Sequence, residues 1–167
     1  KEFVKREYAK RQREKQGPPQ TTQQNRLEWV DELVLSLIKQ RNLHPNSFLD
    51  IGAALQAEDA EHGGKITPAQ TSIDSKKYFE RNGLSLKVTA LDVVPISKEQ
   101  QRVLLKDGVS AYTQDYISRP PYGTFSIIRM ANISIHLTRR EFAQAVSNEF
   151  KALEPNGLLV IHNRTHI

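Results

Sequence analysis

The chain has 167 residues, which is enough for one ordinary domain with a hydrophobic core. It has no cysteine, which excludes disulfides, thiolate zinc sites and cysteine nucleophiles, and a cytoplasmic location is the default expectation. No apolar run approaches the roughly 18 residues needed to span a bilayer, and no basic start followed by an apolar stretch predicts a secretion signal. We therefore expect a globular domain with no membrane span.

The net charge of +5 is concentrated near the start of the chain. Residues 1–16 hold seven basic and three acidic side chains and have the composition of a helix, so we predict a basic N-terminal helix or tail there. Residues 17–25 read as a linker because Gly17-Pro18-Pro19 stops any helix. Residues 26–167 form the predicted domain. The tail suggests nucleic acid or an acidic partner, although a solvated helix is the plainer interpretation.

The first part of the domain predicts a helix, a strand and a second, short helix. Asn25 and Glu28 have the spacing of a capping box, and apolar residues follow at helical spacing to about residue 41. Residues 48–51 form a short apolar strand. Residues 53–74 read mostly as a loop. Ser75 is expected to cap a short helix over residues 76–82, which Gly83 closes.

The second part of the chain alternates between strands and helices. Ser97 with Gln100, and Thr138 with Glu141, predict the starts of two helices. Strands are expected over residues 86–91, 109–113, 124–131 and 158–162, with a loop at 119–123 and a turn at 155–157. Strands that alternate with helices in this way predict a parallel sheet with right-handed crossovers.

Three of the predicted strands end on, or just before, an aspartate. Asp50 and Gly52 close the first strand, Asp92 ends the second, and Asp115 follows the third. Because the carboxyl ends of parallel strands share one edge of a sheet, these acids are expected to line the edge at which open α/β sheets bind ligands.

In this order the segments resemble the motifs of class I, Rossmann-like S-adenosylmethionine-dependent methyltransferases. Residues 48–52 (FLDIG) resemble the first motif, residues 88–93 (VTALDV) the second strand, and residues 112–116 (YTQDY) the segment that meets the adenine. Residues 123–137 resemble the fourth strand and the segment after it. Residues 153–161 (LEPNGLLVI) resemble the turn into the fifth strand.

The resemblance implies a fold, a cofactor and a set of binding residues. The fold would be an α/β/α three-layer sandwich with strand order 3-2-1-4-5, lacking the last strands of the seven-stranded family fold. A further segment or a partner would then cover the fifth strand, since an exposed apolar edge promotes aggregation. The cofactor would be S-adenosylmethionine, with Asp92 on the ribose hydroxyls and Asp115 on the adenine amino group. The implied cofactor-binding residues are Asp50, Gly52, Ala54, Asp92, Val93, Asp115 and Tyr116.

The chain also departs from the family pattern in the first loop. Ala53, Ala54, Leu55 and Gln56 stand where the family usually has further glycines, and the segment up to Asp74 is unusually long. These departures favour an alternative, a degenerate and non-catalytic methyltransferase fold that serves as a binding or scaffolding module. Another Rossmann-like nucleotide-binding enzyme is a weaker alternative, because neither a G-x-G-x-x-G nor a P-loop run is present.

Candidate catalytic residues follow the fourth strand. Asn132 is a candidate substrate contact and His136 a candidate general base, although a surface histidine at a helix entrance is the plainer interpretation. Arg129, if buried, needs an ion-pair partner, an acid such as Asp115. The acidic cluster at 58–62 is better explained as a solvated loop than as a metal site, so no metal is predicted. The methyl acceptor stays open between a small molecule, a protein, a lipid and RNA.

Overall fold

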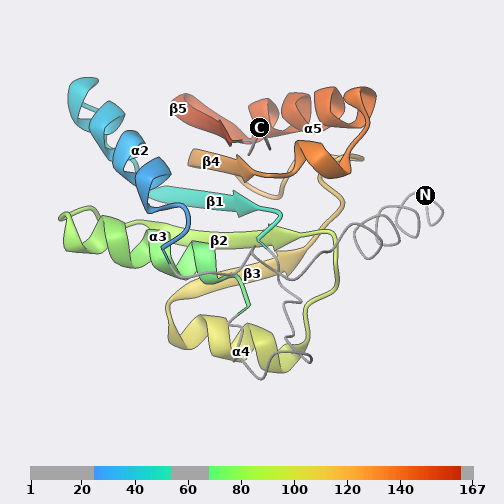
Figure 1. The fold of residues 1–167 in the computed structure, drawn as a ribbon, viewed down its shortest axis with the longest axis horizontal. Coiled ribbons are helices and arrows are strands. Elements are labelled where there is room, and N and C mark those ends of the chain that lie inside the picture. Colours follow the sequence, from blue (N-terminus) through green and yellow to red (C-terminus); the bar gives the residue numbers. More distant parts are fainter. Residues whose placement is uncertain (1–24, 54–67, 163–167) are drawn as a thin grey trace.

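The computed structural model describes residues 25–53 and 68–162, and in this part of the chain it shows a five-stranded, all-parallel sheet (Figure 1). The strand order is β3-β2-β1-β4-β5, as the sequence predicts. The strands are β1 (Ser47–Ile51), β2 (Lys87–Asp92), β3 (Val109–Thr113), β4 (Phe125–Ala131) and β5 (Leu153–His162). The helices are α2 (Glu28–Gln40), α3 (Gln70–Arg81), α4 (Lys98–Lys106) and α5 (Arg139–Ala152), with a 3-10 turn, η2 (Ser134–His136).

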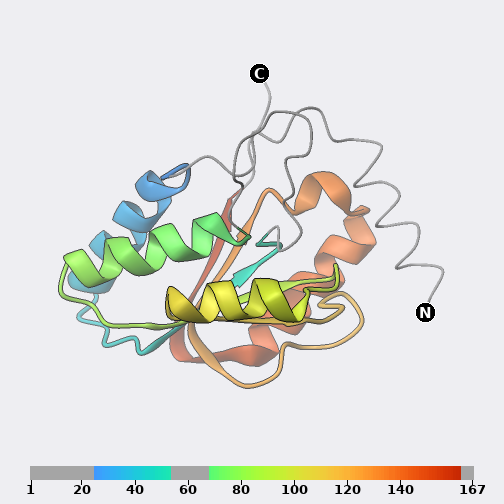
Figure 2. The same ribbon diagram turned by 90° about the horizontal axis from the view of Figure 1, so that it is seen from below.

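Helices cover both faces of the sheet, which makes a three-layer α/β/α sandwich (Figures 1 and 2). On one face, buried residues of α2, α3 and α4 pack with β1, β2 and β4 in a first core cluster. On the other face, α5 and the segment after β3 pack on the sheet in a second core cluster. Side chains of a strand alternate between its two faces, so neighbours in β1 serve different clusters: Phe48 lies in the first and Leu49 in the second.

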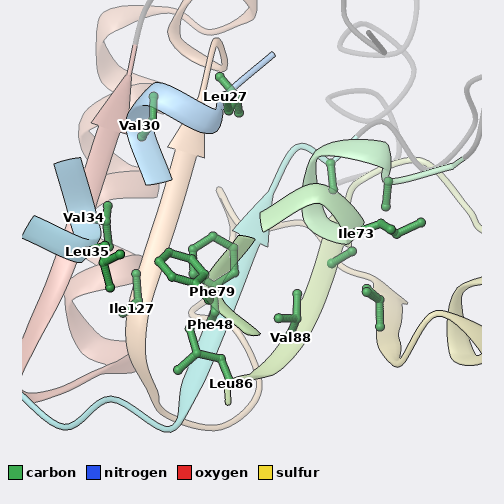
Figure 3. Close-up of a cluster of buried hydrophobic side chains, with 14 of the residues drawn as sticks. Leu27, Val30, Val34, Leu35, Phe48, Ile73, Phe79, Leu86, Val88 and Ile127 are labelled. Carbon is green, nitrogen blue, oxygen red and sulfur yellow. The ribbon is translucent and has the colours of Figure 1, made fainter. Parts of the chain in front are cut away.

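The first core cluster is centred on Phe48 of β1 and Phe79 of α3 (Figure 3). The two rings are fully buried, and their centroids lie 5.9 Å apart in a tilted arrangement. Val34 of α2 and Val88 of β2 belong to the same cluster. The helices α2 and α3 are therefore fixed to the sheet by apolar packing at the amino-terminal half of β1.

Several local predictions are confirmed. Ser97 and Thr138 are the N-caps of α4 and α5, and each forms both bonds of a capping box. Gly83 closes α3 with a left-handed backbone, φ +78°, and the Leu84 N–H bonds back to the carbonyl of Phe79. Hydrogen bonds between near neighbours determine these ends, so the sequence alone predicts them.

The starts of the first two helices differ from the prediction. Asn25 does not cap α2. Its backbone is left-handed, at φ 57°, and its N–H donates to the Asp74 carboxylate at 2.7 Å, while α2 begins at Glu28 without a side-chain cap. The helix α3 begins at Gln70, so Ser75 lies inside it rather than at its start. Both differences arise because groups distant in sequence bond to the residues at these helix starts.

The last strand is longer than predicted. β5 begins at Leu153 and includes the expected turn at 155–157, where Asn156 has φ 64° and the register against β4 shifts. At the other end of β5 the His162 ring meets Trp29 of α2 edge to face, with centroids 4.9 Å apart. The predicted tail 1–16, nearly all of the linker and the segment 54–67 lie outside the described residues. Within the part that is described, no helix is both long and apolar enough to cross a membrane.

Candidate functional site

The carboxyl ends of β1, β2 and β4 lie next to one another at one edge of the sheet (Figure 1). Gly52 follows β1, Asp92 ends β2 and Asn132 follows β4. The ends are bonded together, since the Gly52 N–H donates to the Leu91 carbonyl at 2.8 Å. This edge therefore gathers three of the residues that the sequence singles out.

Gly52 occupies a position that only glycine suits. Its φ of +69° lies in the left-handed region, which costs other residues roughly 1–2 kcal/mol. A Cβ at this position would lie 2.9 Å from Cγ1 of Ile133, the residue after Asn132. The glycine thus lets the segment after β4 pack directly against the turn after β1.

Asp92 is the last residue of β2 and is 3% exposed. One carboxylate oxygen accepts a hydrogen bond from the Val94 N–H at 3.2 Å, and the Asp92 carbonyl accepts one from Gln114 at 2.9 Å. The next residue, Val93, is partly buried against the second core cluster. Asp92 is therefore held in place by the turns that follow β2 and β3.

Asp115 and Tyr116 follow β3 and have different surroundings. The Asp115 carboxylate closes a turn: one oxygen accepts from the Ile117 and Ser118 N–H groups at 3.1 and 3.2 Å, and the other accepts from the Ser118 hydroxyl at 2.5 Å. Tyr116 is 0% exposed and belongs to the second core cluster. The turn positions Asp115 at the sheet edge, whereas the burial of Tyr116 favours a role in packing over stacking on a ligand.

Asn132 and His136 lie in the segment between β4 and α5. Asn132 has a left-handed backbone, φ 57°, and its N–H donates to the His162 carbonyl at 2.7 Å. His136 ends the 3-10 turn η2 and is partly buried. Asparagine tolerates the left-handed region better than most residues, so its presence here suits a sharp turn at the sheet edge.

The best-defined polar feature near this edge is a buried ion pair between Asp50 of β1 and Arg129 of β4. The two residues are partners in the parallel register, so their side chains project from the same face of the sheet. The Arg129 Nε donates to Asp50 Oδ1 at 2.9 Å and Nη2 donates to Oδ2 at 2.7 Å, a two-pronged geometry. Arg129 is 0% exposed and Asp50 is 2% exposed.

The start of α3 adds two donors to Asp50. The hydroxyl groups of Thr71 and Ser72 donate to Oδ2 at 3.0 and 2.7 Å. Burial alone would raise the pKa of Asp50, but Arg129 and the two hydroxyls outweigh it and hold the pKa below its usual range. Asp50 is therefore an ionised, enclosed carboxylate with four donors from within the protein. The resemblance makes Asp50 a cofactor-binding residue, whereas these contacts favour an indirect role for it.

Arg129 also reaches α2 and α3. Nη1 donates to Asp31 Oδ1 at 2.9 Å and to the Ser75 hydroxyl at 2.7 Å, and Nη2 donates to the Thr71 carbonyl at 3.2 Å. All of the guanidinium N–H donors thus have acceptors. The guanidinium carbon of Arg129, Cζ, also lies 5.0 Å from the centre of the Phe48 ring, within the range of a cation–π contact. Burial disfavours the charge of Arg129, but the two aspartates keep its pKa above its usual value.

Asp31 is the second acid of this cluster and is 1% exposed. Its other oxygen accepts from the Ser75 hydroxyl at 2.7 Å. Burial raises its pKa to about 6 despite the attraction of Arg129, and Asp50 and Asp74 add to the rise. We call Asp31, Asp50, Thr71, Ser72, Ser75 and Arg129 the Arg129 clamp.

The prediction that a buried Arg129 needs an acidic partner is confirmed, but the acid given as an example, Asp115, is wrong. The partners are Asp50 and Asp31 instead of Asp115, because strand register and helix packing, not proximity in the chain, decide the pairing. A signal for Asp31 was present in the sequence. It lies between Val30 and Val34 on the buried stripe of α2, where a charge requires a buried partner.

The described residues suit the cofactor that the resemblance implies at Asp92 and Gly52. A carboxylate can accept from both of two vicinal hydroxyls, and the left-handed glycine gives a tight turn beside it. Ala54 and Gln56 lie outside the described residues. Among residues 25–53 and 68–162, no group of three or more His, Asp or Glu side chains could hold a metal ion.

Comparison with solved structures finds the same architecture in methyltransferases. The N-methyltransferase NodS from Bradyrhizobium japonicum WM9, solved with S-adenosyl-L-homocysteine, matches 93% of this chain with a TM-score of 0.55 and 21% identity. The sugar N-methyltransferase KedS8 from Streptoalloteichus sp. matches 80% with a TM-score of 0.54 and 14% identity. An S-adenosylmethionine-dependent methyltransferase from Clostridium acetobutylicum matches 78% with a TM-score of 0.52 and 13% identity.

These likenesses establish that the chain has the class I methyltransferase fold. The chain spans 71% of NodS and about half of the other two, 47% of KedS8 and 48% of the Clostridium enzyme. No protein-family model and no curated protein sequence matches the chain.

Proposed function

We propose that the protein is an S-adenosylmethionine-dependent methyltransferase that transfers a methyl group to an acceptor still to be identified. The observation that carries the proposal is the position of Asp92, a buried carboxylate at the end of β2, in a fold shared with a methyltransferase solved with S-adenosyl-L-homocysteine. A strand-end acid at this edge suits a ribose, since it can accept from both hydroxyls.

The chain's own residues would bind and orient the cofactor. Asp92 would accept from the ribose hydroxyls, Asp115 from the adenine amino group, and Gly52 would provide the tight turn beside them. When bound, the cofactor supplies an electrophilic methyl group on a sulfonium. The protein then contributes mainly alignment and exclusion of water, which are large terms in such reactions. Asn132 and His136 follow β4 at the same edge, where an acceptor would enter.

The proposal is tested by titrating S-adenosyl-L-homocysteine into the protein in a calorimeter. We expect the wild-type chain to bind and Asp92→Ala to lose at least about ten-fold in affinity, because a charge-assisted hydrogen bond is worth about 1.5–3 kcal/mol. Asp107→Ala is the matched control, since Asp107 lies at the C-cap of α4, just before β3 begins, at the opposite edge of the sheet.

The alternative function, a non-catalytic binding module on the same fold, is favoured by the enclosed state of Asp50 and by the altered first loop. Folded wild-type protein that fails to bind at millimolar ligand would exclude the proposed activity and favour this module. Binding without turnover on any acceptor would favour it as well. Amines are the first acceptors to test, because NodS and KedS8 are named as N-methyltransferases.

A further inference from the structure

We propose that Arg129 is a positioning residue, which holds the β1 end of the candidate cofactor site in place through Asp50 and Asp31. The proposal rests on the proposed function only for its link to the cofactor. The hydrogen bonds of the Arg129 clamp are observed whether or not the protein binds that cofactor. Asp50 is two residues before Gly52, and the N–H of Gly52 is bonded to β2. A shift of Asp50 would therefore move the turn beside Asp92.

The clamp contacts both flanks of the segment that joins β1 to α3. Asp50 lies on the β1 flank, and Thr71 and Ser72 lie in the first turn of α3. Their hydroxyls and the Thr71 carbonyl bond to Asp50 and Arg129. Because these groups are buried and fully bonded, the two flanks have one favoured arrangement.

Asp31 lets this arrangement be altered without removing the clamp. Ser75 Oγ contacts Asp31 Oδ2 and lies 2.8 Å from the Thr71 carbonyl. A hydroxyl can donate to that carbonyl while accepting from a protonated Asp31, so both protonation states of Asp31 keep their hydrogen bonds. Asp31→Asn has nearly the shape of the protonated form: its amide oxygen can accept from Arg129, and its amide nitrogen can donate to Ser75. The substitution therefore fixes the neutral state of Asp31 at every pH.

The charged and titratable groups that face Asp31 come from three elements. They are Arg129 from β4, Asp50 from β1, and Asp74 and Tyr78 from α3. Asp50 stays ionised in mildly acidic solution because its pKa is held low, and Arg129 stays charged. With Asp31 at a pKa of about 6, only the charge of Asp31 changes within the clamp between about pH 5 and about pH 7.

The first measurement follows the backbone amide of Gly52 by NMR over this pH range, without any ligand. We expect the wild-type resonance to titrate with a midpoint near the pKa of Asp31, and Asp31→Asn to stay at the low-pH position. Glu32→Gln, an exposed acid on the same helix, is the matched control and should titrate like the wild type. Histidines are present in all three proteins, so the difference between them reports Asp31.

The second measurement repeats the calorimetric titration with S-adenosyl-L-homocysteine at the same pH values. We expect the affinity of the wild type to change several-fold around the same midpoint and that of Asp31→Asn to show no such step. If Asp31→Asn keeps the wild-type titration of Gly52, or changes only the thermal midpoint, the positioning role is wrong. If Gly52 titrates as expected but no protein binds ligand, the proposed function fails and the clamp stands.

Discussion

Buried acids on the two faces of the sheet have opposite surroundings. On the face covered by α2 and α3, Asp50 is bonded to Arg129 and to two hydroxyls. On the other face, Glu149 of α5 is 0% exposed, and neither carboxylate oxygen has a hydrogen-bond partner in the described structure. Desolvation raises the pKa of Glu149 to about 8, whereas that of Asp50 is lowered.

The comparison shows that burial alone does not decide the charge of a carboxyl group. Both acids are removed from water, but only Asp50 has a cation and donors arranged around it. Glu149 is instead kept neutral at mildly acidic and neutral pH. The face covered by α2 and α3 holds ionised groups in a satisfied network beside the candidate site, whereas the face covered by α5 holds a neutral acid without a hydrogen-bond partner in the described structure.

The largest effect on stability is expected from removing the cation of the clamp, Arg129. We expect Arg129→Gln to lower the free energy of unfolding by about 3–5 kcal/mol, because it leaves Asp50 and Asp31 buried without a counter-charge. Urea denaturation monitored by circular dichroism would measure it. Arg119→Gln removes an exposed arginine that stacks on Tyr122 and should cost about 1 kcal/mol or less. A similar small cost for Arg129→Gln would show that the clamp contributes little.

The next largest effect is expected from Glu149, the acid without a hydrogen-bond partner, as a dependence of the free energy of unfolding on pH. Its folded pKa of about 8 lies above the ordinary 4.5, so its contribution to stability is present at low pH and lost as pH rises through that window. Between about pH 6 and about pH 8 the loss in the free energy of unfolding is on the order of 3 kcal/mol. Asp31, with a pKa of about 6, completes most of its titration by about pH 7, so Glu149 should dominate the slope from about pH 7 to about pH 8.

Glu149→Gln should flatten this slope, because the amide stays neutral throughout. Thermal unfolding of both proteins at about pH 6 and about pH 8 would test it, with Glu32→Gln as the exposed control. An unchanged slope in Glu149→Gln would mean that another group causes the pH dependence.

A single donor of the clamp should give the smallest effect. We expect Ser72→Ala to cost about 1–2 kcal/mol, since a buried charge-assisted hydrogen bond is lost. Ser118→Ala removes the same kind of bond, hydroxyl to carboxylate, from the exposed turn at Asp115, and should stay within about 0.5 kcal/mol. An equal loss in the free energy of unfolding for the two variants would contradict the view that burial makes the hydrogen bonds of the clamp more stabilising than exposed ones.

The sequence alone predicts the alternation of strands and helices, the strand order through the family resemblance, and the capped starts of α4 and α5. These features depend on periodicity and on bonds between near neighbours. It also predicts the strand-end residues Gly52, Asp92 and Asn132, which the parallel topology places at one edge. Their roles toward a cofactor remain predictions.

Only the tertiary structure decided which charges meet. Arg129 is paired with Asp50 across the β1–β4 register, and with Asp31 because α2 packs on the same face. The sequence does not predict the start of α3, because no side chain caps this helix and the hydroxyls of its first turn, on Thr71 and Ser72, donate to the distant Asp50. The packing of segments that are distant in the sequence determines which residues bond in a buried network, so a local sequence pattern does not predict these partners.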